Sequence, residues 1–207
     1  MNNEYTFEIL SNRSDYREVI ELIYQTDPYI YKDLFGNIEN AHRVLYRSFE
    51  NPKCVFYKKA IYIVRAKEQV IGVALYHAND FHWDPNALLE DFEKAELQPP
   101  ESFSSVSAYM DKTYNYCKLG NSMCNVSVRS DYQRKGVASF LLASLLDIST
   151  NEIVELTVLS DNIAAIKLYE KFGFKIVGEA FKDYGGHLLP PVDCYKMVLN
   201  RRGFGLN

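Results

Sequence analysis

The stretch between residues 124 and 174 constrains the fold of this chain most strongly. An apolar run at residues 124–128 leads into the basic, glycine-containing turn QRKGVA, and a strongly apolar segment with helical spacing follows. A second β-rich run at residues 153–159 precedes another helical pattern, which ends at Gly173. Strand, helix, strand and helix in this order predict a βαβ unit, whose two strands run parallel.

Further strands and helices are predicted on both sides of this unit. β-rich runs predict strands at residues 5–9, 60–65, 70–76, 175–181 and 194–199. The polar residues 67–69 join the second and third of these strands, which we expect to form an antiparallel hairpin. Helical spacing predicts helices around residues 19–23 and from about 37 to 49, and Ser160 and Asp161 are candidate caps for the last helix.

The first predicted helix is followed by a segment rich in aromatic residues. Asp27 and Pro28 should interrupt that helix, because a residue before proline is pushed out of the α region. We therefore expect Tyr29, Tyr31 and Phe35 to lie in a loop or short turn. Their rings either pack in the core or form the wall of a pocket.

Residues 80–120 interrupt the pattern of strands. Leu88, Leu89, Phe92 and Ala95 mark one amphipathic helix, the proline pair at 99–100 ends it, and a second helical pattern follows from Phe103. About forty residues are too few for an independent core, so we expect a helical insertion between the third and fourth strands. Residues 1–207 should then form one domain, with a loose tail at residues 201–207.

Composition excludes several classes of protein. The 207 residues are 47% hydrophobic and 24% charged, as in soluble globular proteins, and no apolar run is long enough to span a membrane. The first residues lack the features of a secretory signal, which predicts a cytoplasmic protein without a membrane partner. The four cysteines form no C-x-x-C pair, so no metal site is expected, and a net charge of −4 argues against nucleic-acid binding.

The basic turn has the character of an anion site. It lies between a strand and a helix start, where free backbone N–H groups and the positive end of the helix dipole attract anions. Gly136 would let a phosphate approach the backbone, and Arg134 and Lys135 add positive charge. The turn matches neither the Walker P-loop nor the G-x-G-x-x-G pattern. From these residues alone, a pyrophosphate site and a solvated helix end are both open.

The second helix of the unit adds another motif. Asn162, Ala165, Leu168 and Tyr169 have the spacing N-x-x-A-x-x-L-Y, and Gln133, Gly136 and Ala138 have the spacing Q-x-x-G-x-A. With these two motifs in this order, the chain resembles the GNAT superfamily of acyl-CoA-dependent N-acyltransferases. The resemblance implies an α/β (α+β) fold, with a mixed, twisted central sheet that carries helices on both faces.

The resemblance also implies roles for individual residues. Acetyl-CoA would be the cosubstrate, and its pyrophosphate would lie on the backbone of the turn formed by Gln133, Arg134, Lys135, Gly136, Val137 and Ala138. The strand at Val126 and Val128 would pair with the pantetheine arm, and Asn162 would contact that arm or an ordered water. Tyr169 would donate a proton to the departing thiolate. Without the resemblance, Tyr169 would be interpreted as a core aromatic residue of its helix.

The acceptor half of the site is less defined by the sequence. The acceptor would be a small-molecule amine or a protein N-terminus, enclosed by Tyr29, Tyr31 and part of the insertion. Asp111, Glu155 and His77 are candidates for removing its proton, and a chain of waters is an alternative. Transfer should be direct, because no cysteine lies beside a histidine in the motif region.

Three functions are consistent with these patterns. The first is an N-acetyltransferase that moves an acetyl group from acetyl-CoA directly to a primary amine. The second is a non-catalytic acyl-CoA sensor or docking module of the same fold, which would need the turn but not Tyr169. The third is a nucleotide-binding module, which would bind ATP tightly.

Overall fold

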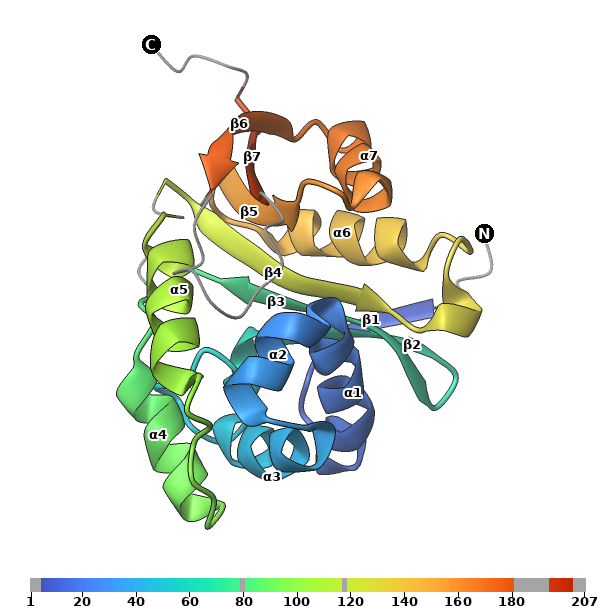
Figure 1. Ribbon diagram of the computed structural model, residues 1–207. Coiled ribbons are helices and arrows are strands. Elements are labelled where there is room, and N and C mark those ends of the chain that lie inside the picture. The colour runs from blue at the N-terminus through green and yellow to red at the C-terminus, as the bar shows by residue number, and fades with distance from the viewer. Residues whose placement is uncertain (1–4, 79–80, 117–118, 181–193, 203–207) are drawn as a thin grey trace.

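A seven-stranded mixed sheet forms the centre of the protein (Figure 1). The computed structural model describes residues 5–78, 81–116, 119–180 and 194–202. The strands are β1 (Tyr5–Ile9), β2 (Ile61–Ala66), β3 (Gln69–His77), β4 (Asn121–Val128), β5 (Ile153–Leu159), β6 (Lys175–Ala180) and β7 (Cys194–Asn200). Their order in the sheet is β1-β2-β3-β4-β5-β7-β6, so β7 lies between β5 and β6. The predicted hairpin and the predicted parallel pair are both confirmed, as β2–β3 and β4–β5.

Helices cover both faces of the sheet, as expected. The α-helices are α1 (Tyr16–Thr26), α2 (Pro28–Phe35), α3 (Ile38–Ser48), α4 (Pro85–Lys94), α5 (Phe103–Tyr116), α6 (Val137–Ile148) and α7 (Ile163–Lys171). Short 3-10 turns precede α1, β2 and α6, at Arg13–Asp15 (η1), Lys58–Ala60 (η2) and Ser130–Tyr132 (η3). Figure 1 shows α1, α2 and α3 grouped on one side of β4 and α6 on the other.

Two hydrophobic cores result from this arrangement. One lies between the sheet and α1 to α5, and the other joins the opposite face of the sheet to α6 and α7. Alternation along β2 explains the division, because Ile61 and Ile63 belong to the first core and Val64 and Ala66 to the second. The sheet is therefore buried on both faces in its centre.

The segment after α1 differs from the sequence-based expectation. Tyr31 and Phe35 do not lie in a loop, because residues 28–35 form helix α2. Asp27 ends α1 and at the same time caps α2, since its Oδ1 accepts a hydrogen bond from the N–H of Ile30 at 3.0 Å. Pro28 occupies the first turn of α2, where its missing N–H costs nothing. The proline was a correct signal for the end of one helix and also began the next.

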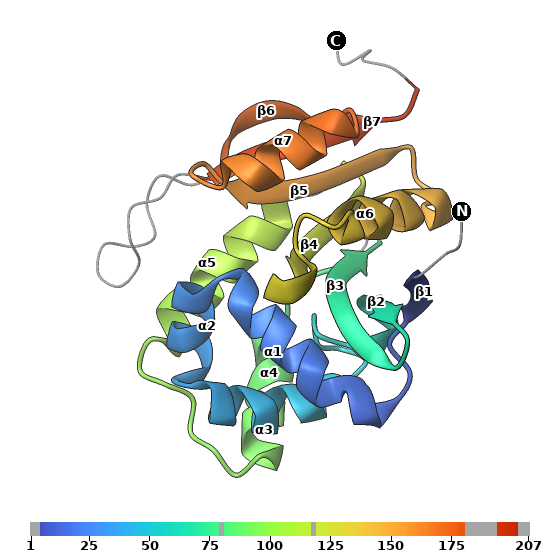
Figure 2. The ribbon, with the colours of Figure 1, turned by 90° about the vertical axis from the view of Figure 1, so that its right-hand side faces the viewer.

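The two helices of the insertion extend the helical layer rather than cover the sheet. They lie between β3 and β4, as predicted, and α4 contacts α3 while α5 contacts α2. Figure 2 shows α5 beside α2 in a view turned by 90°. The insertion thereby places α5 next to the start of β4.

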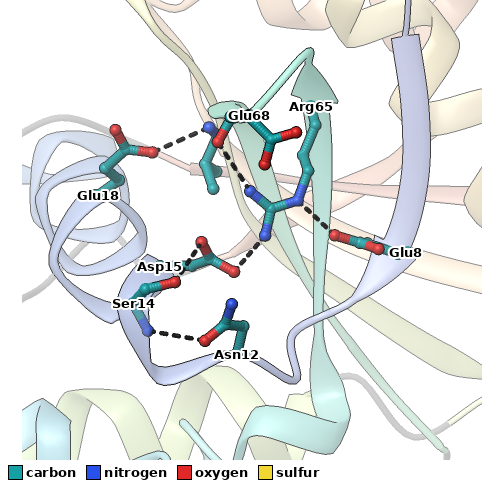
Figure 3. Close-up of polar contacts among 8 residues, drawn as sticks. Glu8, Asn12, Ser14, Asp15, Glu18, Arg65 and Glu68 are labelled. Atoms are coloured by element: carbon teal, nitrogen blue, oxygen red, sulfur yellow. Dashed lines mark hydrogen bonds and ion pairs between the residues drawn. The ribbon is translucent and has the colours of Figure 1, made fainter.

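Arg65 on β2 fixes the beginning of α1 to the sheet (Figure 3). Its guanidinium donates hydrogen bonds to Glu8 on β1, to Asp15 before α1, and to the backbone oxygen of Glu68 in the β2–β3 turn. Glu18 on α1 accepts a hydrogen bond from the N–H of Val70 at 2.9 Å. Arg65 therefore joins β1, the β2–β3 turn and the segment before α1, and it sets the position of α1 over the sheet.

The end of the chain is anchored further than predicted. Arg201 donates hydrogen bonds to the backbone oxygens of Leu146 and Ser149 at 3.0 and 3.1 Å, and Arg202 pairs with Glu152. Arg201 thus covers the C-terminus of α6, where carbonyl groups lack helical partners, and Arg202 is held beside the segment before β5. Residues 203–207 lie outside the described residues.

A buried ion pair holds the start of the parallel β4–β5 pair. Glu155 on β5 is fully buried, and its Oε1 accepts hydrogen bonds from the N–H groups of Leu119 and Gly120. Its Oε2 lies 2.5 Å from the Nζ of Lys196 on β7. Only glycine fits at position 120, because a Cβ atom there would clash with the carbonyl oxygen of Ile153.

Replacing Glu155 should therefore weaken the fold. In Glu155→Gln the buried side chain of Lys196 loses its carboxylate partner, and we expect the free energy of unfolding to fall by about 3 kcal/mol. Urea denaturation followed by circular dichroism measures this loss. Glu152→Gln is the matched control on the same segment, because its partner Arg202 is 79% exposed and such pairs contribute about 1 kcal/mol or less. Equal losses of unfolding free energy in the two variants would contradict a special stabilising role of the buried Glu155–Lys196 pair.

Candidate functional site

The parallel strands β4 and β5 separate soon after they begin. They pair only at Asn121 with Val154 and at Ser122 with Glu155. Beyond Ser122 the described residues of the two strands form no further ladder pairs. A cavity of about 170 Å³ lies where they separate, and both strand edges line it. The carboxyl ends of separating parallel strands are a common place for ligand sites in sheets of this kind.

One wall of the cavity comes from β5 and α7, and we call it the α7 wall. It consists of Thr157, Val158, Leu159, Asn162, Ala165 and Tyr169. Tyr169 is 7% exposed, and its ring packs against Phe174 with centroids 5.8 Å apart. Burial raises the pKa of its hydroxyl well above the usual value, and Cys124 nearby raises it further. The phenol therefore stays protonated at neutral pH and can donate a hydrogen bond into the cavity.

Asn162 has a structural task as well as a place on the α7 wall. It is the N-cap of α7, and its Oδ1 accepts a hydrogen bond from the N–H of Ala165 at 3.1 Å. The predicted caps, Ser160 and Asp161, are therefore wrong by one or two positions. Because the cap uses the oxygen of the side chain, its amide group remains as the donor that a ligand in the cavity could meet.

The opposite wall comes from α1, α2 and α5, and we call it the α2 wall. It consists of Thr26, Asp27, Ile30, Tyr31, Tyr109 and Met110. Tyr31 was predicted to enclose an acceptor, and the structure places it on this wall, buried at 2% exposure. The side chain of Tyr29 lies outside the described residues. Tyr109 and Met110, from the insertion, also line this wall, and whether it encloses an acceptor stays a prediction.

A bulge in β4 forms the floor between the walls. Leu75 pairs with Cys124 and Val73 with Ser127, so that Asn125 and Val126 together oppose a single residue of β3. Asn125 adopts a left-handed conformation with φ of 54°. Val126 lines the cavity, whereas Val128, further along the strand, does not. The bulge thus turns the strand edge where the cavity is.

The side chain of Asn125 links the floor to the α2 wall. Its amide group donates hydrogen bonds to the hydroxyl of Thr26 at 2.8 Å and to the hydroxyl of Tyr31. Burial raises the pKa of Tyr31 well above its usual value, and Cys124 and Asp27 raise it further, against an opposing effect of the bond from Asn125. Sequence reasoning missed Asn125, although an asparagine inside an apolar strand is a signal for a left-handed residue.

The basic turn lies outside the cavity, at the start of α6. Gln133 closes the turn by donating a hydrogen bond to the backbone oxygen of Val128 at 3.2 Å. Gly136 is the N-cap of α6 with φ of 86°, a conformation that favours glycine. Arg134 is exposed, and Lys135 lies over the ring of Tyr132 at 5.1 Å. In Figure 1, α6 runs back alongside β4 from this turn.

The N-terminus of α6 is open to an anion. No side chain caps this helix, in contrast to α7, which Asn162 caps. Val137 and Ala138 precede the first intrahelical hydrogen bond, from the N–H of Phe140 to the oxygen of Gly136. A Cβ atom at Gly136 would meet no other atom within 4 Å, so there is room beside the backbone. These features are those of an oxyanion or phosphate site.

The three residues considered for proton removal lie elsewhere. Glu155 is occupied by two N–H groups and Lys196. His77 is buried at the end of β3, which lowers its pKa to about 4, and Asp111 is exposed on α5. Within the described part of the chain, none of the three lines the cavity. The same part contains no group of three side chains that could hold a metal ion and no helix long and apolar enough to cross a membrane.

Comparison with known proteins gives a consistent result. The sequence model of the acetyltransferase (GNAT) family matches residues 23–174. The curated L-amino acid N-acetyltransferase AaaT of Escherichia coli (strain K12) is 38% identical over 77 residues, which are 35% of this chain and 47% of that protein. The chain thus matches about half the length of this relative.

Solved structures resemble the whole chain. An N-acetyltransferase from Staphylococcus aureus Mu50 has a TM-score of 0.63 at 17% identity, covering 94% of this chain and 100% of that one. The structure of yncA from Salmonella typhimurium with its cofactor acetyl-CoA has a TM-score of 0.61 at 16% identity, covering 98% and 97%. At these identities the likeness is one of fold.

The capping role of Asn162 can be tested by measuring the free energy of unfolding of two variants. Asn162→Ala removes the cap of α7, and we expect the free energy of unfolding to fall by about 1 kcal/mol. Asn162→Asp keeps an oxygen for the N–H of Ala165 and should stay within about 0.5 kcal/mol of the parent protein. Urea denaturation compares the three proteins. An aspartate variant as unstable as the alanine variant would exclude capping as the structural role.

Proposed function

Because the chain belongs to the acetyltransferase (GNAT) family, we propose that it transfers an acetyl group from acetyl-CoA directly to a primary amine. The observation that carries this proposal is the separation of β4 and β5, with Tyr169 in the cavity between them and an uncapped helix N-terminus beyond. That arrangement offers one ligand both a place for a phosphate group and a strand edge that leads into the cavity.

The turn before α6 would hold the pyrophosphate of CoA. The backbone N–H groups of Val137 and Ala138 lie at the positive end of the α6 dipole, with open space beside Gly136. Arg134 and Lys135 add two positive charges at the same place. A chain with a net charge of −4 thus concentrates positive charge where an anionic cosubstrate would bind.

The pantetheine arm would extend from this turn along β4. The arm contains amide groups, and an unpaired strand edge binds extended amides through its own N–H and C=O groups. Val126 and Val128 lie on that part of β4, beyond the last pair with β5. The amide group of Asn162 would supply a further hydrogen bond from the α7 wall.

Tyr169 would assist the departure of the thiol. Acetyl-CoA supplies a thioester, so a neutral amine forms the new C–N bond as the C–S bond breaks, and CoA leaves as a thiol. Full proton transfer from a free tyrosine with a pKa of ~10 to a thiolate of ~8.5 is unfavourable by about 2 kcal/mol, and the raised pKa of Tyr169 increases this cost. We therefore assign Tyr169 the donation of a hydrogen bond to sulfur as negative charge develops there.

The amine must lose a proton before it reacts. For an amine with a pKa of ~10.4, the neutral form costs about 4.6 kcal/mol at pH 7. Glu155, His77 and Asp111 do not line the cavity in the described residues, so the proton would pass to water. Cys124 lines the cavity, but among the described residues no histidine lies there to activate its thiol as a nucleophile. We therefore propose direct transfer from acetyl-CoA to the amine.

Acetyl-CoA should bind to the protein in the absence of an acceptor, and ATP should bind with a much higher dissociation constant. Titration calorimetry measures both dissociation constants. In Arg134→Glu a negative charge replaces a positive one at the turn, and we expect acetyl-CoA to bind about tenfold more weakly. Lys53→Glu makes the same change of charge on an exposed residue away from the turn and should leave binding unaltered. Absence of binding at millimolar acetyl-CoA would refute the proposed function.

Tyr169→Phe should lower kcat by about 10- to 100-fold, because the donor to the leaving sulfur is lost. The dissociation constant of acetyl-CoA should change by less than twofold. Release of CoA, detected with a thiol reagent, gives kcat. Tyr62→Phe is the control, since it removes a partly buried hydroxyl on β2, away from the cavity. An unchanged kcat would deprive Tyr169 of this role, and binding without any CoA release would favour the sensor instead.

Two expectations from the sequence remain predictions. A single domain over residues 1–207 and a cytoplasmic location are compatible with what is described. The acceptor that we propose is a primary amine, either in a small molecule or at a protein N-terminus.

A further inference from the structure

The bulge in β4 turns Asn125 toward the helices of the α2 wall. Met123 packs in the core beneath α6 and α7, and Cys124 packs against the core of α1 to α5. In a regular strand Asn125 would lie on the face of Met123, because successive side chains alternate. The extra residue of the bulge places it on the face of Cys124 instead, where it bonds to α1 and α2. The bulge thus puts an amide where strand alternation would not.

Hydrogen bonding fixes which end of this amide faces the α2 wall. Thr26 donates its own proton to the backbone oxygen of Ile23 at 2.7 Å, so its hydroxyl oxygen is an acceptor toward other groups. The end of the Asn125 amide that lies 2.8 Å from this oxygen is therefore the NH2 group. The second hydrogen of the NH2 group goes to the hydroxyl of Tyr31. Both amide hydrogens are used on the α2 wall, and Oδ1 is at the other end of the amide.

The oxygen Oδ1 of Asn125 is placed to accept a hydrogen bond from a ligand. Asn125 is half-buried and lines the cavity, and within the described part of the chain its Oδ1 accepts no hydrogen bond. The preceding residue, Cys124, lies close enough to Tyr31 and to Tyr169 to raise the pKa of both. This part of the floor therefore lies between the α2 wall and the hydroxyl that would meet the leaving sulfur.

Resting on the proposed acetyl transfer, we propose that Asn125 binds the amino group of the acceptor through Oδ1. A neutral primary amine has two N–H bonds and one lone pair. One N–H donates to Oδ1 of Asn125, which directs the lone pair at the thioester carbon. As the C–N bond forms and the C–S bond breaks, one proton passes from nitrogen to water and the sulfur takes one up, so that CoA leaves as a thiol.

A neutral oxygen suits this task better than a carboxylate. The neutral amine is the form that attacks, and a carboxylate beside it would stabilise the ammonium form and make loss of the proton more costly. The amide oxygen of Asn125 carries no net charge and accepts a hydrogen bond from the neutral amine. The floor of the cavity would thus orient the nucleophile without favouring its unreactive form.

Two substitutions separate binding by Oδ1 from a purely structural role of the amide. Asn125→Gly removes the side chain, and glycine keeps the left-handed backbone without strain. Asn125→Asp keeps an oxygen at the position of Oδ1 and tolerates the same backbone, but it cannot donate to Thr26 or Tyr31. CoA release at saturating acetyl-CoA gives KM for the acceptor. We expect KM to rise about tenfold in Asn125→Gly and less than about threefold in Asn125→Asp.

Glu96→Gly is the matched control for the change of backbone. Glu96 also has a left-handed conformation, with φ of 55°, but it is exposed after α4 and does not line the cavity. Its KM and kcat should equal those of the parent protein. In all three variants the dissociation constant of acetyl-CoA should change by less than about twofold, which shows that the variants are folded.

Two results would overturn the inference. One is an unchanged KM in Asn125→Gly. The other is a KM in Asn125→Asp as high as in Asn125→Gly, because the bonds donated to the α2 wall, rather than the oxygen, would then be what matters. Where turnover of a variant is too slow for KM, kcat/KM replaces it in the same comparison.

The choice of acceptor separates failure of this inference from failure of the proposed function. Phenethylamine, L-phenylalanine, L-phenylalaninamide and a short peptide with a free N-terminus are tested first with the parent protein. The one with the highest kcat/KM then serves for all variants. Turnover by the parent protein with either contradicting result would overturn the role of Asn125 alone. Acetyl-CoA binding with no turnover of any of the four acceptors would overturn both proposals.

Discussion

The separation of two parallel strands is the constraint on which the site depends. At their beginning, β4 and β5 are held together by Glu155. Its carboxylate accepts hydrogen bonds from the N–H groups of Leu119 and Gly120, just before β4, and pairs with Lys196 on β7. Gly120 permits the close approach there. After two ladder pairs the strands separate, and the cavity occupies the space. A residue that seemed a candidate base therefore serves to fix the closed end of the site.

The two walls of the cavity divide the chemistry between them. The α7 wall presents neutral donors, the amide of Asn162 and the protonated hydroxyl of Tyr169, which suit a thioester and its leaving sulfur. The α2 wall presents Asp27 beside the side chains of Ile30, Tyr109 and Met110. Asn125 joins the floor to the α2 wall, because the bulge places its backbone in the floor and its side chain on Thr26 and Tyr31.

The family match covers both walls of the cavity. It spans residues 23–174, which include both motifs of the βαβ unit and the insertion that contributes Tyr109 and Met110 to the α2 wall. The known relative named for L-amino acids matches over about half its length. A shared fold with acetyltransferases therefore does not by itself identify the acceptor.

The sequence by itself determined the elements whose signals are local. The parallel unit, the hairpin, Gly173 at positive φ and the motif that includes Tyr169 all follow from spacings of a few residues. Short-range signals also misled, because they predicted a loop after Pro28 where α2 forms, and Ser160 and Asp161 as caps where Asn162 is the cap. Only the tertiary structure decided the bulge at Asn125, its contact with Tyr31 across 94 positions and the place of Asp27 in the cavity. Those features depend on how α2 packs beside β4, which no periodicity in either segment encodes.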